Sequence, residues 1–241
     1  MAASETPPTL NTSTIDAIDE LHSVGNRIHI SFGGGTMTSE AYAGLTSFES
    51  TIANSIADFV IKYDLDGIDI DFEDTQAFMN SATYNGVDLL VKLTSELRKL
   101  LPSGKFSITH APQPPYLVPN NGMDGYVDVM KNVGDQIDWL NVQFYNNPPW
   151  SSNPAEIIRA VQQFGQLTNL SPYQIMVGLP VTTHDAATGY IPVNEVISDI
   201  IDPLNNMKIL EGMMNWQFAS DKDGTWGKAI GNAMGINNPG T

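Results

Sequence analysis

The feature that most constrains this chain is the stretch from Asp66 to Glu73 (DGIDIDFE), where acidic and large apolar residues alternate. An alternation of two is the period of a β-strand, whose successive side chains point to opposite faces. The carboxylates of Asp69, Asp71 and Glu73 therefore share one face, and three apolar side chains share the other. A glycine precedes the alternation and a helical pattern leads into it, which is typical of a buried parallel strand between helices.

Three carboxylates side by side in a buried strand repel one another, so at least one is expected to keep its proton at neutral pH. A protonated carboxylic acid beside an ionised one is the pairing that cuts a glycosidic bond. An EF-hand calcium loop also begins Asp-x-Asp-x-Asp, but it needs polar spacers, and Ile70 and Phe72 are the spacers here. A solvated acidic face is the usual fate of a charge run, but the bulky apolar face argues against it.

The acids also fit a known signature. Asp66, Asp69, Asp71 and Glu73 match Asp-x-x-Asp-x-Asp-x-Glu, and in this the chain resembles glycoside hydrolase family 18, the chitinases and their relatives. Residues 31–34 (SFGG) are similar to the second family motif, Ser-x-Gly-Gly, which lies one strand before the acids. Two motifs in the right order, about one βα unit apart, are stronger evidence than either alone.

Strand and helix patterns alternate along the rest of the chain. Helices are expected over residues 15–24, 47–63, 86–101, 124–134, 154–166, 193–201 and 224–235. Strands are expected over residues 28–32, the acid run, 106–109, 137–144, 174–179 and 208–216. Ser13 is the candidate cap of the first helix, and Pro203 is expected to end the helix before it.

Six strand–helix units in succession imply a parallel sheet with right-handed crossovers. Polar residues and glycines gather at the carboxyl ends of the strands, as on the active face of a TIM barrel. We therefore expect an α/β, TIM-barrel-type fold that is incomplete, with six βα units instead of eight. Residues 1–14 form a polar N-terminal segment, and residues 15–241 are expected to be a single catalytic domain.

The amino-acid composition restricts the classes of molecule that the protein can bind. The formal net charge of −16 repels nucleic acid and anionic membranes, and it suits a neutral or cationic substrate such as a polymer of amino sugars. The chain has no cysteine, which excludes disulfides and cysteine-bound metals, and we expect no metal or other cofactor. An open barrel edge invites association, so a homo-oligomer that covers the edge is also expected. We expect a secreted enzyme, although residues 1–14 lack the apolar centre of a signal peptide.

For catalysis, the resemblance implies a reaction with retention in which the 2-acetamido oxygen of the substrate attacks the sugar carbon. Glu73 would protonate the leaving oxygen, Asp71 would accept the acetamido N–H, and Asp69 would join a network of shared protons. Tyr145, in a run similar to a family motif (QFYN, residues 143–146), would hold the acetamido oxygen in line.

The resemblance also implies residues that bind the sugar. Trp216, which ends the similar run GMMNW, would floor the pocket and stack on the sugar, and its peptide bond to Gln217 is expected to be cis. Gln143 would hydrogen-bond the sugar. The remaining residues expected at the substrate are Gly33, Gly34, Gln113 and Asn146. Asp66 is expected to order the strand start, and His110 to be structural.

The leading hypothesis is an endo-acting chitinase that cleaves β-1,4-linked N-acetylglucosamine polymers. An endo-β-N-acetylglucosaminidase acting on N-glycans would share the acids but use different loops. A non-catalytic chitin-binding lectin of the same fold is the third hypothesis, because a pocket that lacks two strands can bind without cutting. We expect the two missing strands to weaken the activity.

Overall fold

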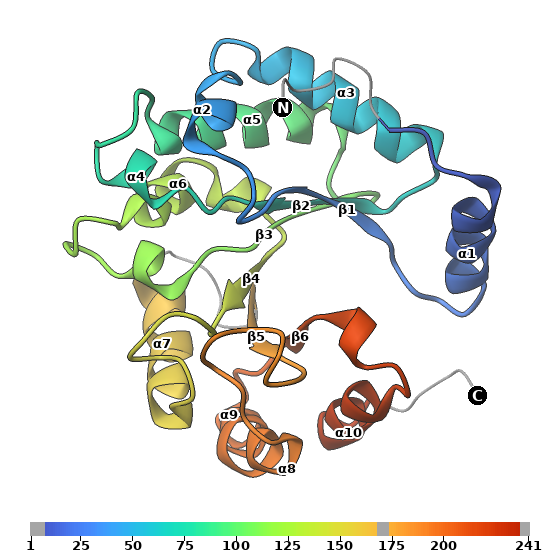
Figure 1. Ribbon diagram of the computed structural model, residues 1–241, viewed down its shortest axis with the longest axis vertical. Helices are drawn as coiled ribbons and strands as arrows, with labels where there is room; N and C mark the ends of the chain where they lie inside the picture. Colours follow the sequence, from blue (N-terminus) through green and yellow to red (C-terminus); the bar gives the residue numbers. More distant parts are fainter. Residues whose placement is uncertain (1–7, 168–173, 237–241) are drawn as a thin grey trace. The chain divides into compact units, whose positions relative to one another are not determined.

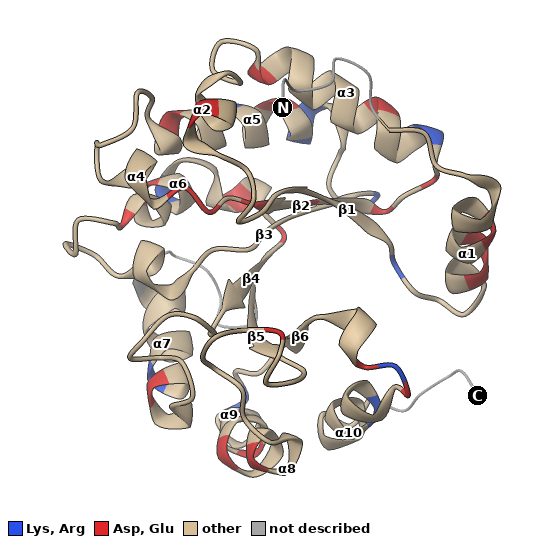
Figure 2. Ribbon diagram, in the orientation of Figure 1, with Lys and Arg blue, Asp and Glu red and all other residues tan. Residues whose placement is uncertain are grey.

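A computed structural model describes residues 8–167 and 174–236 (Figure 1). The contacts of the chain divide it into two compact units. The first unit comprises residues 1–110 and 128–138, and the second comprises residues 111–127 and 139–241. No helix among the described residues is long and apolar enough to cross a membrane. Acidic residues mark the helices of both units and basic residues are sparse, in keeping with the net charge of −16 (Figure 2).

The first unit is built on three parallel strands in chain order. They are β1 (His29–Gly33), β2 (Gly67–Asp71) and β3 (Ser107–His110). In the register, Ser31 lies opposite Asp69, Gly33 opposite Asp71, and Asp69 opposite Thr109. The predicted parallel strand at the acids is therefore confirmed.

Two long helices lie side by side against this sheet, α3 (Glu49–Lys62) and α5 (Gly86–Leu100) (Figure 1). The Asn85 side chain caps α5 by accepting the Asp88 N–H at 3.0 Å, and leucines three or four residues apart form its buried face. The unit also holds α1 (Thr12–Ser23), α2 (Ser39–Ala43), α4 (Thr75–Phe78), and most of α6 (Gly125–Val133). The sequence did not predict α2 and α4, which are a single turn each.

The predicted cap of the first helix was wrong by two residues. The cap of α1 is Asn11, whose side-chain oxygen accepts the Thr14 N–H at 2.9 Å. Ser13 instead lies inside the first turn, and its hydroxyl donates to the same Asn11 oxygen at 2.7 Å. Both residue types are good caps, so the sequence alone did not decide between them.

The second unit repeats the pattern with β4 (Trp139–Gln143), β5 (Ile175–Pro180) and β6 (Gly212–Trp216), again parallel and in chain order. Its helices are α7 (Pro154–Leu167), α8 (Val193–Val196), α9 (Asp202–Asn206) and α10 (Thr225–Ala233). The described residues thus hold six strands, each at a predicted position, although β6 starts later than expected.

The predicted helix end at Pro203 was also wrong. A five-residue π-helical segment, Ile197–Ile201, follows α8, and the chain continues directly into α9 with Pro203 in its first turn. Proline is tolerated there because the first turn of a helix leaves its N–H groups without an intrahelical partner. The π-helical segment changes the hydrogen-bond pattern, so α9 begins anew after it and Pro203 again occupies a first turn, although the helical run is continuous.

Candidate active site

The acid strand has the two faces that its alternation predicted. The apolar side chains of Ile68, Ile70 and Phe72 are at most 1% exposed, whereas those of Asp69, Asp71 and Glu73 are half-buried. Because β2 is a regular strand paired on both sides, its geometry is not that of a calcium-binding loop.

The glycine run after β1 lies directly against the acids. The Gly34 N–H donates to the Asp71 carbonyl oxygen at 2.6 Å, and Gly33 takes a left-handed φ of +115°. A Cβ at Gly33 would meet the Asp71 carbonyl oxygen at 2.1 Å, and one at Gly35 would meet a Glu73 carboxylate oxygen at 3.1 Å. Only glycine permits this approach, so the first unit brings predicted residues of both motifs together.

A neighbour of Asp69 escaped the sequence analysis. The Thr109 hydroxyl on β3 donates to Asp69 Oδ1 at 2.5 Å, and the two residues are register partners. This hydrogen bond fixes the position of the Asp69 carboxylate beside the other acids. The alternation of the predicted strand 106–109 could have placed Thr109 on this face, had the register been known.

At the opposite, amino-terminal end of these strands, acidic side chains have hydrogen-bond and ionic partners. Asp66 Oδ2 accepts the Ile28 N–H at 2.7 Å and lies 3.0 Å from His22 Nε2. Burial opposes the charge on Asp66, but the backbone N–H and the histidine outweigh it and hold the pKa of that carboxyl below its usual value. Asp66 thus orders the strand start, as predicted.

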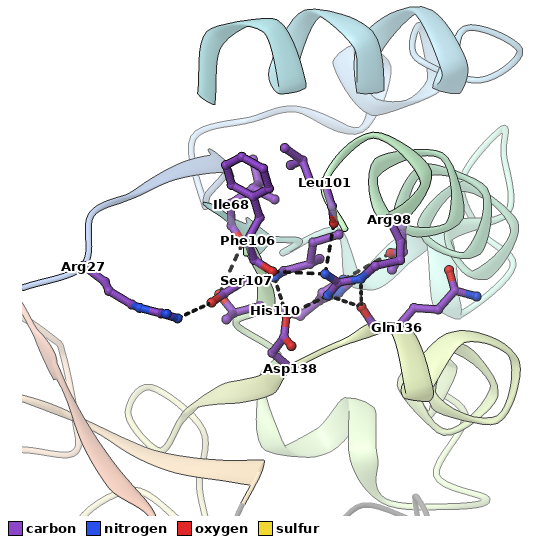
Figure 3. Close-up of polar contacts among 12 residues, drawn as sticks. Arg27, Ile68, Arg98, Leu101, Phe106, Ser107, His110, Gln136 and Asp138 are labelled. Carbon is purple, nitrogen blue, oxygen red and sulfur yellow. Dashed lines mark hydrogen bonds and ion pairs between the residues drawn. The ribbon is translucent and has the colours of Figure 1, made fainter. Parts of the chain in front are cut away.

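A second pair, between Arg98 and Asp138, lies at the same end of the sheet (Figure 3). Arg98 Nη2 donates to Asp138 Oδ2 at 2.6 Å, and the guanidinium also donates to the Gln136 carbonyl oxygen. Asp138 Oδ2 in turn accepts the Ile108 N–H at 2.7 Å. One charge pair therefore ties α5 to the start of β3 and to the segment before β4.

His110 is structural, as predicted. It ends β3, it is fully buried, and its Nε2 lies 3.2 Å from the Thr94 hydroxyl on α5. Burial lowers the pKa of His110 to about 3, so the ring is neutral at physiological pH.

In the second unit, Tyr145 and Trp216 lie together after β4 and at the end of β6. Their rings stack with centroids 6.4 Å apart and planes 21° from parallel. Tyr145 is only 6% exposed, but Trp216 is 42% exposed and offers an aromatic face. The peptide bond from Trp216 to Gln217 is cis, which confirms the prediction.

The amide side chains around Tyr145 mostly form hydrogen bonds with backbone groups of the neighbouring loops. Gln143 Nε2 donates to the Ala111 carbonyl oxygen at 2.8 Å, so at least one of its donors is used within the protein. Asn146 Oδ1 accepts the N–H groups of Ala187 and Thr188, and this fixes the loop after β5. Asn147, which the sequence analysis missed, is buried and donates to the Tyr145 carbonyl oxygen at 2.7 Å.

Gln113 occupies a different kind of position from the other predicted residues. It caps the 3₁₀ helix Pro114–Leu117, where its carbonyl oxygen accepts the Tyr116 N–H at 3.0 Å, and its side chain is half-buried. The second unit thus places Gln143 at the end of β4 and Tyr145 and Asn146 on the loop that follows, with the Trp216 ring stacked on that of Tyr145. The first unit holds the acids and the glycines.

Residues 4–229 match the sequence profile of the family described as glycosyl hydrolases family 18. The chain belongs to this family. It is 49% identical to a family 18 chitinase from Pseudoalteromonas aurantia, whose crystal structure superposes with a TM-score of 0.92 over 97% of this chain and 85% of that one. The predicted family and the TIM-barrel-type α/β fold are therefore confirmed.

Plant proteins show the same relationship at lower identity. An acidic endochitinase of Phaseolus angularis is 26% identical over 234 residues, which cover 93% of this chain and 72% of the relative. A basic endochitinase of Nicotiana tabacum is 28% identical over 229 residues, which cover 90% and 71%.

Proposed function

We propose that this protein is an endo-acting chitinase that hydrolyses the β-1,4 bonds of N-acetylglucosamine polymers. The observation that carries the proposal is the acid strand, in which Asp69, Asp71 and Glu73 stand half-buried on one face at the carboxyl end of a parallel strand. Membership of family 18 and 49% identity to a chitinase support the same substrate.

In the proposed reaction, Glu73 donates its proton to the glycosidic oxygen as the bond to the sugar carbon breaks. The acetamido carbonyl oxygen of the same sugar attacks that carbon and closes an oxazolinium ring, so no enzyme carboxylate becomes attached. Asp71 accepts the acetamido N–H and offsets the positive charge that develops on the ring. Asp69, held by the Thr109 hydroxyl, shares protons with Asp71.

Water completes the reaction. Glu73, now a carboxylate, takes a proton from a water molecule that attacks the same carbon, which opens the ring and restores the acid. Two displacements at one carbon give net retention of configuration.

The second unit supplies groups suited to hold the sugar. The exposed ring of Trp216 is proposed as the stacking platform, and the Tyr145 hydroxyl as the donor to the acetamido oxygen. Gln143 is proposed to bind a sugar hydroxyl, and Gln113 and Asn146 to line the substrate path. Gly33 and Gly34 are proposed to let the sugar approach the backbone, because they present no side chain.

Three wider proposals accompany the activity. We propose that residues 15–241 act as one catalytic domain, because the family match runs through both units. We propose that the enzyme is secreted, because a cell meets polymeric chitin outside its membrane.

We also propose that copies associate through β1 and β6, the outer strands of their units, whose residues are half-buried or exposed. Light scattering over a range of concentrations tests the last, and a strict monomer contradicts it.

The activity is tested by offering a chitin tetramer and a high-mannose glycopeptide side by side and analysing the products. A chitinase releases shorter oligomers from the tetramer with retained configuration and leaves the glycopeptide intact. Cleavage of the glycopeptide alone favours the endo-β-N-acetylglucosaminidase hypothesis. Binding of the tetramer without cleavage favours the lectin.

A further inference from the structure

Tyr42, on the short helix α2, lies directly behind the acids. Its hydroxyl donates to the carbonyl oxygen of Asp71 at 3.2 Å and is hydrogen-bonded to the backbone of Glu73. The side chain is only 2% exposed. One phenol oxygen therefore contacts the backbone of both Asp71 and Glu73. In the proposed reaction, Asp71 stabilises charge and Glu73 transfers the proton.

The residues around Tyr42 pack closely against its ring and its hydroxyl. Its ring packs against Phe72, the residue between the two acids, with centroids 4.7 Å apart. A Cβ at Gly33 would meet the Tyr42 hydroxyl at 2.8 Å as well as the Asp71 carbonyl oxygen, so the glycine of the first motif also makes room for the phenol. Burial raises the pKa of Tyr42, which keeps the hydroxyl protonated and able to donate.

The Tyr42 hydroxyl contacts the chain at the point where β2 ends. The strand β2 ends at Asp71, so Glu73 lies beyond the last residue of the ladder that fixes the backbone. Backbone groups beyond the ladder must find their hydrogen bonds elsewhere, and the phenol supplies one from outside the sheet. On the Asp71 carbonyl oxygen, the phenol adds a second hydrogen bond to the one from the Gly34 N–H.

We propose that Tyr42 is a positioning residue of this active site, which fixes the backbone from Asp71 to Glu73 and so holds both carboxylates in their working geometry. The proposal rests on the proposed function, in which these two residues carry the chemistry. Tyr42 itself touches neither the substrate nor the reacting atoms. Its effect is geometric, and a misplacement of about 1 Å is enough to slow an enzyme by about 10²-fold.

The test is Tyr42→Phe, which removes one oxygen and keeps the ring against Phe72. We expect kcat on a chitin tetramer to fall by about tenfold while KM changes less than about twofold, because geometry is lost and binding is kept. The matched control is Tyr63→Phe, since Tyr63 is also a largely buried tyrosine of the first unit, and its hydroxyl accepts the Leu10 N–H at 3.2 Å. Its kcat should equal that of the wild type.

Amide hydrogen exchange of the wild-type protein gives a readout that needs no variant. The Glu73 amide should exchange as slowly as that of Ile70 inside β2, and Tyr42→Phe should release Glu73 while Ile70 stays protected. Exchange of the wild-type Glu73 amide as fast as that of exposed Asn80 contradicts the proposal even where the variant does not fold.

The outcomes separate this inference from the function on which it rests. If Glu73→Gln is inactive but Tyr42→Phe has full kcat, the positioning role is wrong and the proposed reaction stands. If Glu73→Gln keeps its activity, the proposed reaction itself is wrong. If Tyr42→Phe and Tyr63→Phe lose kcat equally, the loss reflects general destabilisation and the positioning role is again wrong.

Discussion

The two ends of the acid strand place the same type of residue in opposite settings. Asp66, just before β2, accepts a backbone N–H and lies beside His22, so its carboxylate holds the start of the strand. Asp71, at the other end, lies against a glycine turn on a face that it shares with two further acids. All belong to one motif, yet position along the strand separates the acid that holds the fold from those suited to chemistry.

The rest of the first unit repeats this division. At the amino-terminal end of the sheet, Asp138 pairs with Arg98 and ties three segments together (Figure 3). At the carboxyl end, Asp69 accepts a hydroxyl from Thr109, and Tyr42 supports the backbone beneath the acids. The two ends are therefore expected to be separable: substitutions at the amino-terminal end should change stability, and substitutions at the carboxyl end should change activity.

The largest effect is expected at the carboxyl end, from Glu73→Gln. Glutamine keeps the size of the side chain but has no acid proton, so kcat on chitin tetramer should fall by about 10²–10⁴-fold. The free energy of unfolding should stay within about 0.5 kcal/mol of the wild type, since the residue is half-buried and its shape is kept. Activity above about a tenth of the wild-type rate would refute the role of Glu73 as the acid.

The next effect tests the close contact between the motifs. Gly33→Ala puts a Cβ 2.1 Å from the Asp71 carbonyl oxygen, and we expect a loss of at least about 3 kcal/mol in unfolding free energy together with most of the activity. Gly104→Ala is the matched control, because Gly104 also has a left-handed φ, of +84°, but open space around it. It should cost only about 1 kcal/mol. Equal losses in both would mean that the approach to Asp71 is not tight.

A smaller effect, on stability alone, is expected at the amino-terminal end. Asp138→Asn leaves the Arg98 guanidinium without its charged partner, and we expect unfolding free energy to fall by about 1–3 kcal/mol with kcat unchanged. Asp128→Asn breaks an exposed pair with Lys131 and should cost less than about 0.5 kcal/mol. A fall in kcat for folded Asp138→Asn would show that the two ends are not separable.

The last effect is absent at neutral pH and appears only on acidification, as a dependence of stability on pH through His110. Its pKa of about 3 in the fold lies below the ordinary 6.5, so between these values the unfolded chain binds a proton that the folded chain does not. Stability from this group is therefore complete above about pH 6.5 and falls as the pH falls, by up to about 1.4 kcal/mol per pH unit. His110→Gln should show a shallower fall between pH 6 and 4, measured by urea unfolding at several pH values.

Much of this division was predictable from the sequence, because it depends on local pattern. The alternation at Asp69–Glu73 predicted a two-faced strand, and the run of helices and strands predicted the parallel order. Asp66 and His110 were predicted to be structural, and the structure gives each of them a side-chain partner within hydrogen-bond distance, His22 for Asp66 and Thr94 for His110.

The remainder depends on contacts between segments far apart in the sequence. Thr109 meets Asp69 through the strand register, and Tyr42 meets Asp71 through the packing of α2 behind the strand; a single sequence contains neither. Asn147 looked like one more loop amide until its bond to the Tyr145 carbonyl oxygen was seen. Pro203 misled for another reason, since its effect on a helix depends on whether a π turn precedes it.

The most direct test of the separation is to measure two matched variants of the acid motif, Asp66→Asn and Asp71→Asn, for both kcat on chitin tetramer and free energy of unfolding. We predict that Asp66→Asn lowers the unfolding free energy by about 1–2 kcal/mol and leaves kcat within about threefold of the wild type. Asp71→Asn should lower kcat by at least about a hundredfold with stability unchanged. A folded Asp66→Asn with the same loss of kcat as Asp71→Asn, or an Asp71→Asn that loses stability and keeps its kcat, would contradict the account.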